Sequence, residues 1–158
     1  MPMALDELVF FPNINSVLQV TIRIVVAGIL GGIIGYEREV KGKAAGLRTH
    51  MLLAMGTVIV LVVARLDGIP MSEMSKVIEG LVTGVGFLGG GAILKLSDKQ
   101  EIRGVTTAAS IWSTSAIGIA VGLGQIWIGI LSTIVVWIIL FVVGYLEKRV
   151  WNLNKDRA

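Results

Sequence analysis

Residues 28–32 of this chain read Gly-Ile-Leu-Gly-Gly, and residues 86–90 read Gly-Phe-Leu-Gly-Gly. The two stretches lie 58 residues apart, and three further pairs keep the same offset: Lys41 and Lys99, Gly46 and Gly104, and Thr49 and Thr107. Each stretch ends a long apolar run and is followed by a charged segment and a second apolar run. The pattern predicts an internally duplicated membrane domain.

The apolar runs around these stretches have the length of transmembrane helices. The chain has 158 residues, of which 54% are hydrophobic, and its mean hydropathy is +0.83. About twenty apolar residues cross the bilayer core as a helix, and helices are expected because backbone groups in lipid must bond within their own segment. We therefore expect an all-α membrane protein, one domain over residues 1–158, with five spans at residues 17–36, 47–66, 77–96, 105–123 and 125–146. Spans one and two would recur in spans three and four as a parallel tandem repeat.

Basic residues are sorted between the two ends of these spans. Eleven fall in the links after spans one and three and in the tail: Arg38, Lys41, Lys43, Arg48, Lys95, Lys99, Arg103, Lys148, Arg149, Lys155 and Arg157. The opposite end has only Arg65 and Lys76. By the positive-inside rule, the N-terminus lies outside and the C-terminus in the cytoplasm, which predicts a multi-pass membrane protein.

The glycines form candidate packing surfaces. Span one carries Gly28, Gly31, Gly32 and Gly35 within about 100° of one another around a helix. Span three carries Gly84, Gly86, Gly89, Gly90 and Gly91. One interpretation is close helix packing, including a dimer face. The alternative is a broken third helix whose free backbone groups meet an ion or solute.

Two charged residues fall inside the spans, where ionisable groups are functional candidates. Arg23 lies in span one and Glu79 lies near the outer end of span three. An ion pair between Arg23 and Glu79 would lower the cost of burying either charge in the membrane. Arg23 is, however, about 140° around its helix from the glycine stripe, so it could instead point toward a second subunit. For Glu79, the alternative is that its carboxylate reaches the outer interface.

A second set of candidates gathers at the predicted cytoplasmic end. It comprises Glu37 and Glu39 at the end of span one, Arg48, Thr49 and His50 at the start of span two, and Thr106 and Thr107 at the start of span four. The hydroxyls could simply cap helix amides. Alternatively, the set forms a cytoplasmic mouth for ions, since Glu37 and Glu39 would suffice chemically for Mg²⁺. We expect His50 to be interfacial and not a metal ligand.

Span four is unusually rich in hydroxyl groups. Thr106, Ser110, Ser113 and Thr114 share one face at helical spacing, next to Thr107. Interhelical hydrogen bonding and the lining of a polar path both fit this face.

No signature of an enzyme is visible. The chain has one histidine, no cysteine, no phosphate loop and no nucleophile elbow. We therefore expect no catalytic residue and no cofactor, with Mg²⁺ as the one ion the residues could accommodate.

Four segments of the chain resemble the MgtC/SapB family of bacterial inner-membrane proteins. They are residues 31–39 (GGIIGYERE), 46–50 (GLRTH), 84–94 (GVGFLGGGAIL) and 103–124 (RGVTTAASIWSTSAIGIAVGLG). The resemblance implies a five-span membrane domain and a link to magnesium limitation, membrane energetics and, in some members, virulence. Many members carry a cytoplasmic C-terminal domain, which we expect this chain to lack because only residues 147–158 follow the last span.

Two functions remain open from the sequence. The first is a homo-oligomer, expected to be a dimer, that transports Mg²⁺ or another small solute past the span-three glycines, the span-four hydroxyls and Glu79 or Glu37. The second is a regulatory protein without a pore, whose glycine-rich helix faces bind other membrane proteins. In both cases the lipid bilayer surrounds the protein, and no nucleic-acid partner is expected.

Overall fold

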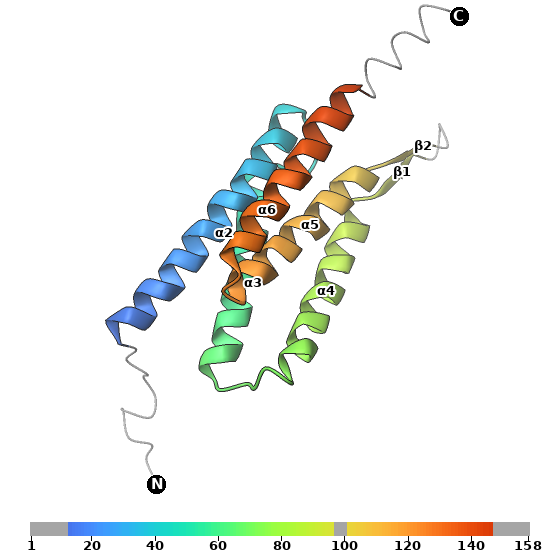
Figure 1. Cartoon of the computed structure of the whole chain (residues 1–158). Coiled ribbons are helices and arrows are strands. Elements are labelled where there is room, and N and C mark those ends of the chain that lie inside the picture. Colours follow the sequence, from blue (N-terminus) through green and yellow to red (C-terminus); the bar gives the residue numbers. More distant parts are fainter. Residues whose placement is uncertain (1–12, 97–100, 147–158) are drawn as a thin grey trace, which may run out of the picture.

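A computed structural model of the chain describes residues 13–96 and 101–146. Within them, five long helices run side by side (Figure 1). The helices are α2 (Ile14–Val40), α3 (Leu47–Leu66), α4 (Met74–Gly91), α5 (Val105–Gly122) and α6 (Ile126–Ile138), which continues through the π-helical turn η1 (Ile139–Val143). This confirms the predicted all-helical architecture, with one small addition between α4 and α5.

The addition is a two-stranded hairpin that corrects the predicted end of the third span. Strands β1 (Leu94–Leu96) and β2 (Glu101–Arg103) pair in antiparallel register. The sequence predicted a span over residues 77–96, but α4 ends at Gly91. The three consecutive glycines at its end are weak helix formers, and the residues after them gain hydrogen bonds by pairing with β2.

Gly104 allows α5 to begin directly beneath this hairpin. Its backbone is left-handed, with φ of 94°. A Cβ atom at this position would also collide with the carbonyl oxygen of Ala92. Only glycine satisfies both conditions, so Gly104 holds the start of α5 close against the end of α4.

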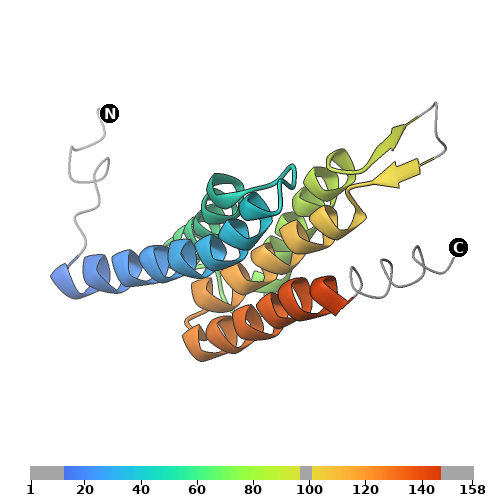
Figure 2. The ribbon, with the colours of Figure 1, turned by 90° about the horizontal axis from the view of Figure 1, so that it is seen from above.

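α5 is the central helix of the bundle, in contact with the other four (Figure 2). The main apolar core joins α2, α3, α5 and the π-helical turn: Ala27, Leu30, Ile34, Ala54, Val58, Val62, Ile117, Val121 and Leu140. α4 lies at the edge, packed mainly on α5 and only lightly on α3. This asymmetry leaves much of α4 uncovered by its own chain.

Successive connections lie at opposite ends of the bundle. The α2–α3 link, the hairpin and the end of η1 gather at one end, and the α3–α4 link and the α5–α6 turn lie toward the other (Figure 1). Four of the described helices are long and apolar enough to cross a membrane: α2, α3, α5 and the helix spanning Ile126–Leu146. The orientation in the membrane and the tandem repeat stay predictions.

Candidate functional site

The α2 glycines bring the backbones of α2 and α3 into contact. A Cβ atom on Gly31 would lie 2.5 Å from the carbonyl oxygen of His50, and one on Gly35 would lie 2.7 Å from the Cα atom of Leu47. Gly28 and Gly32 face the side chains of Met55 and Met51 less tightly. All four glycines of the predicted stripe therefore face α3, and they set the last turn of α2 beside the first turn of α3.

That last turn of α2 carries a buried cluster of charges. The Glu37 carboxylate, whose side chain is only 4% exposed, contacts the Lys41 ammonium and lies 3.7 Å from Nη1 of Arg38. Arg38 Nη2 donates to the Thr107 hydroxyl on α5 at 3.2 Å. Arg38 Nε has no hydrogen-bond partner in the described part of the chain, and the Glu37 oxygens have none there apart from these ion-pair contacts. Mutual charge neutralisation therefore has to offset most of the cost of burying the pair.

Lys41 links this cluster to the π-helical turn. Its Nζ donates to the carbonyl oxygen of Leu140 at 2.7 Å and lies 5.6 Å from the centre of the Phe141 ring, which stacks on Trp137. π-helical turns leave backbone groups with unusual partners and often occur at functional sites. Lys41, which is paired with Glu37 of α2, thus links the end of α2 to η1 through a carbonyl and an aromatic face.

His50 is fully buried beside the cluster, which corrects the expectation that it is interfacial. Its Nδ1 lies 2.9 Å from the Gly46 carbonyl oxygen, and its Nε2 lies 3.2 Å from the hydroxyl of Ser110. Ser110 donates to the Thr107 carbonyl oxygen at 2.8 Å. A chain of hydrogen bonds therefore joins α3 to the start of α5.

Glu39, the second predicted carboxylate, has a capping role in this structure. Its Oε2 accepts a hydrogen bond from the Leu47 backbone N–H at 2.8 Å, at the first turn of α3. A carboxylate at this position is favoured by the helix dipole. Arg48 and Thr49 on the same turn are exposed.

The predicted hydroxyl face of α5 divides into buried and open positions. Thr107, Ser110 and Thr114 are buried, Ser113 is half-buried and Thr106 is exposed. Ser113 and Thr114 donate to carbonyl oxygens one turn earlier in their own helix. One interhelical contact was missed by the sequence reasoning: Ser115 lies 3.3 Å from the hydroxyl of Thr57 on α3.

Arg23 and Glu79 do not form the ion pair considered from the sequence. Arg23 Nη1 donates to the Gly122 carbonyl oxygen at 3.1 Å, so the guanidinium lies at the C-terminal end of α5, where a cation is favoured. Glu79 is exposed on α4. The Arg23 side chain therefore contacts the end of α5, whereas the Glu79 side chain lies on the exposed surface of α4.

The α4 glycines are largely unpacked. A Cβ atom on Gly84, Gly86, Gly90 or Gly91 would meet nothing within 4 Å, whereas one on Gly89 would touch Ala108 of α5 at 3.7 Å. The helix is continuous from Met74 and ends at Gly91, so the glycine triplet terminates the helix and does not interrupt it.

An apolar groove of about 520 Å³ runs between α3 and α4. Gly56 of α3 and Gly80 and Gly84 of α4 form part of its wall, and their Cβ positions are open. The remaining lining is almost wholly apolar: Leu52, Leu53, Thr57, Val60, Val77, Leu81, Val85 and Leu88. The groove was not predicted, because it depends on how far α4 stands from α3.

The predicted Mg²⁺ chemistry depends on carboxylates that are free to bind an ion. The described ranges contain no group of three or more His, Asp and Glu side chains that could hold a metal ion. Of the two carboxylates proposed for Mg²⁺, Glu37 contacts two cations and Glu39 accepts from a backbone amide.

The sequence reasoning left Lys41 out of the site. Its position four residues after Glu37 could have predicted their ion pair, because residues at this spacing are neighbours on a helix.

Three relatives illustrate what the chain is similar to. YhiD of Escherichia coli strain K12, provisionally named a magnesium transporter, is 40% identical over 141 residues, which are 84% of this chain and 64% of YhiD. SrpB of Synechococcus elongatus is 33% identical over 92% of this chain and 85% of SrpB. MgtC of Salmonella typhimurium is 34% identical over 83% of this chain and 52% of MgtC.

The chain thus spans about half to two thirds of the length of YhiD and MgtC. No solved structure matches it significantly. The pattern that defines the MgtC family matches residues 24–149, which include all five helices except the first turns of α2. Together with the apolar helices, these matches establish a multi-pass membrane protein that belongs to the MgtC family.

Proposed function

We propose that this chain contributes to magnesium homeostasis in the bacterial cytoplasmic membrane by binding a transmembrane helix of another membrane protein. The link to magnesium is supported by the family and by the name of YhiD. The mode of action is supported by one observation above others, the open groove between α3 and α4 with its three uncovered glycines.

The packing of the bundle argues against a solute path through the protomer. The middle of the bundle is filled by apolar side chains of α2, α3 and α5 that are 0–6% exposed. Closely packed apolar side chains leave no room for hydrated ions. The buried polar groups lie mainly toward one end, where Glu37, Arg38 and His50 have partners within the protein.

The groove, by contrast, has the features of a helix-binding surface. Glycine at three positions lets a second backbone approach closely, which is how helices associate in lipid. The wall runs along α4 from Val77 to Leu88, about 16 Å of helix at 1.5 Å per residue. A transmembrane helix laid there would cover the gap left by the light contact between α3 and α4.

The test combines photo-cross-linking with growth under magnesium limitation. A photo-reactive residue at Val60, a half-exposed position in the groove, should cross-link a partner protein, whereas one at Val63, an exposed α3 position outside the groove, should not. Gly84→Leu fills the groove and should abolish both the cross-link and the ability of the protein to support growth under magnesium limitation. Gly84→Ala, which leaves most of the groove open, should retain both. Equal cross-linking at Val60 and Val63, or full growth support by a well-expressed Gly84→Leu protein, overturns the proposal.

Transport is the second candidate, and one observation favours it. Glu79 presents a carboxylate on the second turn of α4 that has no ion-pair partner in the described part of the chain, as expected of an ion station on a polar path. Purified protein in liposomes with an internal Mg²⁺-sensitive dye separates the candidates. We expect no flux above that of empty vesicles. Flux that Glu79→Gln abolishes would instead establish transport.

A further inference from the structure

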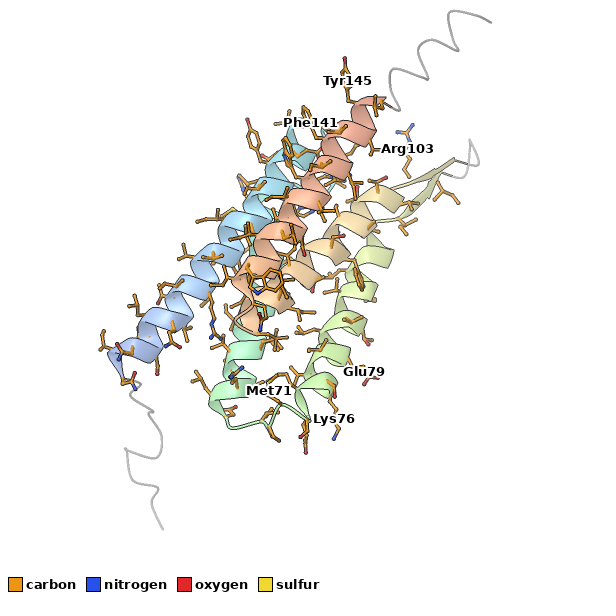
Figure 3. All side chains as sticks on the ribbon, viewed as in Figure 1. Met71, Lys76, Glu79, Arg103, Phe141 and Tyr145 are labelled. Carbon is orange, nitrogen blue, oxygen red and sulfur yellow. The ribbon has the colours of Figure 1, made fainter. Side chains whose placement is uncertain are left out.

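The outward face of α4 is poorly suited to lipid. Only Met74, Val85 and Gly89 of this helix are buried, so most of it faces away from the bundle. The exposed positions include Lys76, Glu79, Thr83, Gly86 and Gly90, alongside the apolar Val82, Phe87 and Leu88. Figure 3 shows the side chains of Lys76 and Glu79 pointing away from the other helices. Charged and polar groups facing hydrocarbon are costly and normally face protein or water.

α6 shows that exposure alone does not explain this composition. Among α6 residues only Gly129 and Thr133 are buried, yet its exposed positions are almost all Ile, Leu, Val and Trp. α6 forms most of one of the four candidate membrane spans that length and apolar composition identify, and α4 is more polar and is not among these four. α6 therefore suits lipid contact, whereas α4 has the composition of a helix that another protein surface covers.

The charges on this face are arranged for self-pairing. At about 100° per residue, Lys76 and Glu79 lie about 60° apart around α4, and Thr83 and Gly90 lie between them. Gly86 lies about 20° beyond Glu79. The Lys76 side chain is 76% exposed, and its ion-pair contact with the 58% exposed side chain of Glu73 is 3.8 Å long. One face thus presents a cation, a carboxylate without an ion pair in the described part of the chain, small residues between them and beside Glu79, and the exposed Phe87 about 20° beyond Lys76.

We propose that this face binds the same face of a second copy of the chain. Two copies inserted in the same orientation are related by a two-fold axis along the membrane normal, which makes their α4 helices parallel. With Thr83 and Gly90 at the contact, the two-fold sets Lys76 of each copy opposite Glu79 of the partner subunit. Gly86 and Gly90, whose Cβ positions are open, let the two backbones approach.

This dimer face is distinct from the groove. The groove is lined by Gly80 and Gly84, which lie about 60–100° around α4 from Thr83. A second copy can therefore occupy the outward face while the groove stays open to a partner helix. The inference does not rest on the proposed function, and either can fail without the other.

Cysteine cross-linking tests the contact directly, since the native chain has no cysteine. In oxidised membranes, Thr83→Cys and Gly90→Cys should each give a covalent dimer. The matched control Ile134→Cys, half-exposed on α6, should give at least tenfold less dimer at equal expression. Cross-linking of Thr83→Cys no greater than that of the α6 control overturns the proposal.

A charge exchange tests the pairing. Lys76→Glu or Glu79→Lys alone should lower the association constant in liposomes, measured by energy transfer between labelled copies, by about tenfold. The double variant should restore it to near the wild-type value. Gly90→Leu should lower association while Gly84→Leu leaves it unchanged. A double variant no better than the worse single variant, or association lost with Gly84→Leu and kept with Gly90→Leu, overturns this assignment of the interface.

Discussion

α2 and α4 carry the same glycine pattern and use it in opposite ways. On α2, Cβ atoms at Gly31 and Gly35 would lie within 3 Å of α3 backbone atoms. On α4, the corresponding Gly89 has only ordinary van der Waals contact with α5, and Gly86 and Gly90 have open space. One copy of the pattern builds the fold of the protomer, and the other remains available to a second molecule.

The difference arises from which face of each helix the bundle covers. α2 turns its glycine stripe toward α3, so these glycines pack against another helix of the same chain. α4 turns Met74, Val85 and Gly89 inward, Gly80 and Gly84 toward the groove, and Gly86 and Gly90 outward. A glycine pattern therefore predicts that a close approach occurs, but not whether the approaching helix belongs to the same chain.

The charges on the two helices follow the same division. Glu37 and Arg38 on α2 are 6% and 3% exposed and are paired with each other, Lys41 and Thr107. Lys76 and Glu79 on α4 are exposed. We therefore expect substitutions on α2 to affect folding and substitutions on α4 to affect association.

The largest effect is expected from Glu37→Gln. The amide keeps the shape of the side chain but leaves Arg38 buried without its counter-charge, and breaking a buried ion pair in this way costs about 3–5 kcal/mol. Thermal unfolding of the detergent-purified protein, followed by size-exclusion chromatography, should show a strongly destabilised or poorly recovered variant. Glu79→Gln on α4, the matched control, should unfold like the wild type at a detergent-to-protein ratio high enough to separate the copies.

A double variant sharpens this test. Glu37→Gln combined with Arg38→Gln removes both buried charges and should be more stable than Glu37→Gln alone, because only the partly exposed Lys41 is then left without its carboxylate. Additive destabilisation by the two substitutions would contradict the pairing of these side chains.

A smaller effect is expected from Gly31→Ala. The added methyl group would lie 2.5 Å from the His50 carbonyl oxygen and 3.1 Å from the Ala54 Cβ, so α2 and α3 must move apart. Overpacking of this kind costs about 1–3 kcal/mol, which the same unfolding assay measures. A Gly31→Ala protein as stable as the wild type would show that the α2–α3 crossing is looser than described.

The helices were predictable from sequence because length and apolar composition determine them locally. The predicted second span, residues 47–66, coincides with α3, and the fourth differs from α5 by one residue. The third span was placed too far along the chain, because the pairing of residues 94–96 with 101–103 has no signal in apolar composition.

The candidate site was less accessible to sequence reasoning. The sequence singled out Glu37, Thr107 and Ser110 by residue type, but their partners depend on the relative rotation of α2, α3 and α5. The contact between Lys41 and the Leu140 carbonyl also requires the π-helical turn, whose residues, Ile139–Val143, read as an ordinary apolar helix. Glu79 and the α4 glycines were likewise identified by type, but their exposure depends on the position of α4 at the edge of the bundle.

The smallest effect, and the one most specific to the comparison, is expected from Gly86→Ala. A methyl group at this position meets nothing within 4 Å in the protomer, and alanine favours the helix over glycine by about 0.8–1.0 kcal/mol. The isolated protomer, measured at high detergent-to-protein ratio, should therefore gain a few tenths of a kcal/mol to about 1 kcal/mol in stability. At the same time the methyl group should hold the two α4 helices slightly apart and lower association between copies. Stabilisation of the protomer together with weaker association would separate the two uses of the glycine pattern, whereas destabilisation of the protomer would mean that α4 is packed within its own chain as tightly as α2.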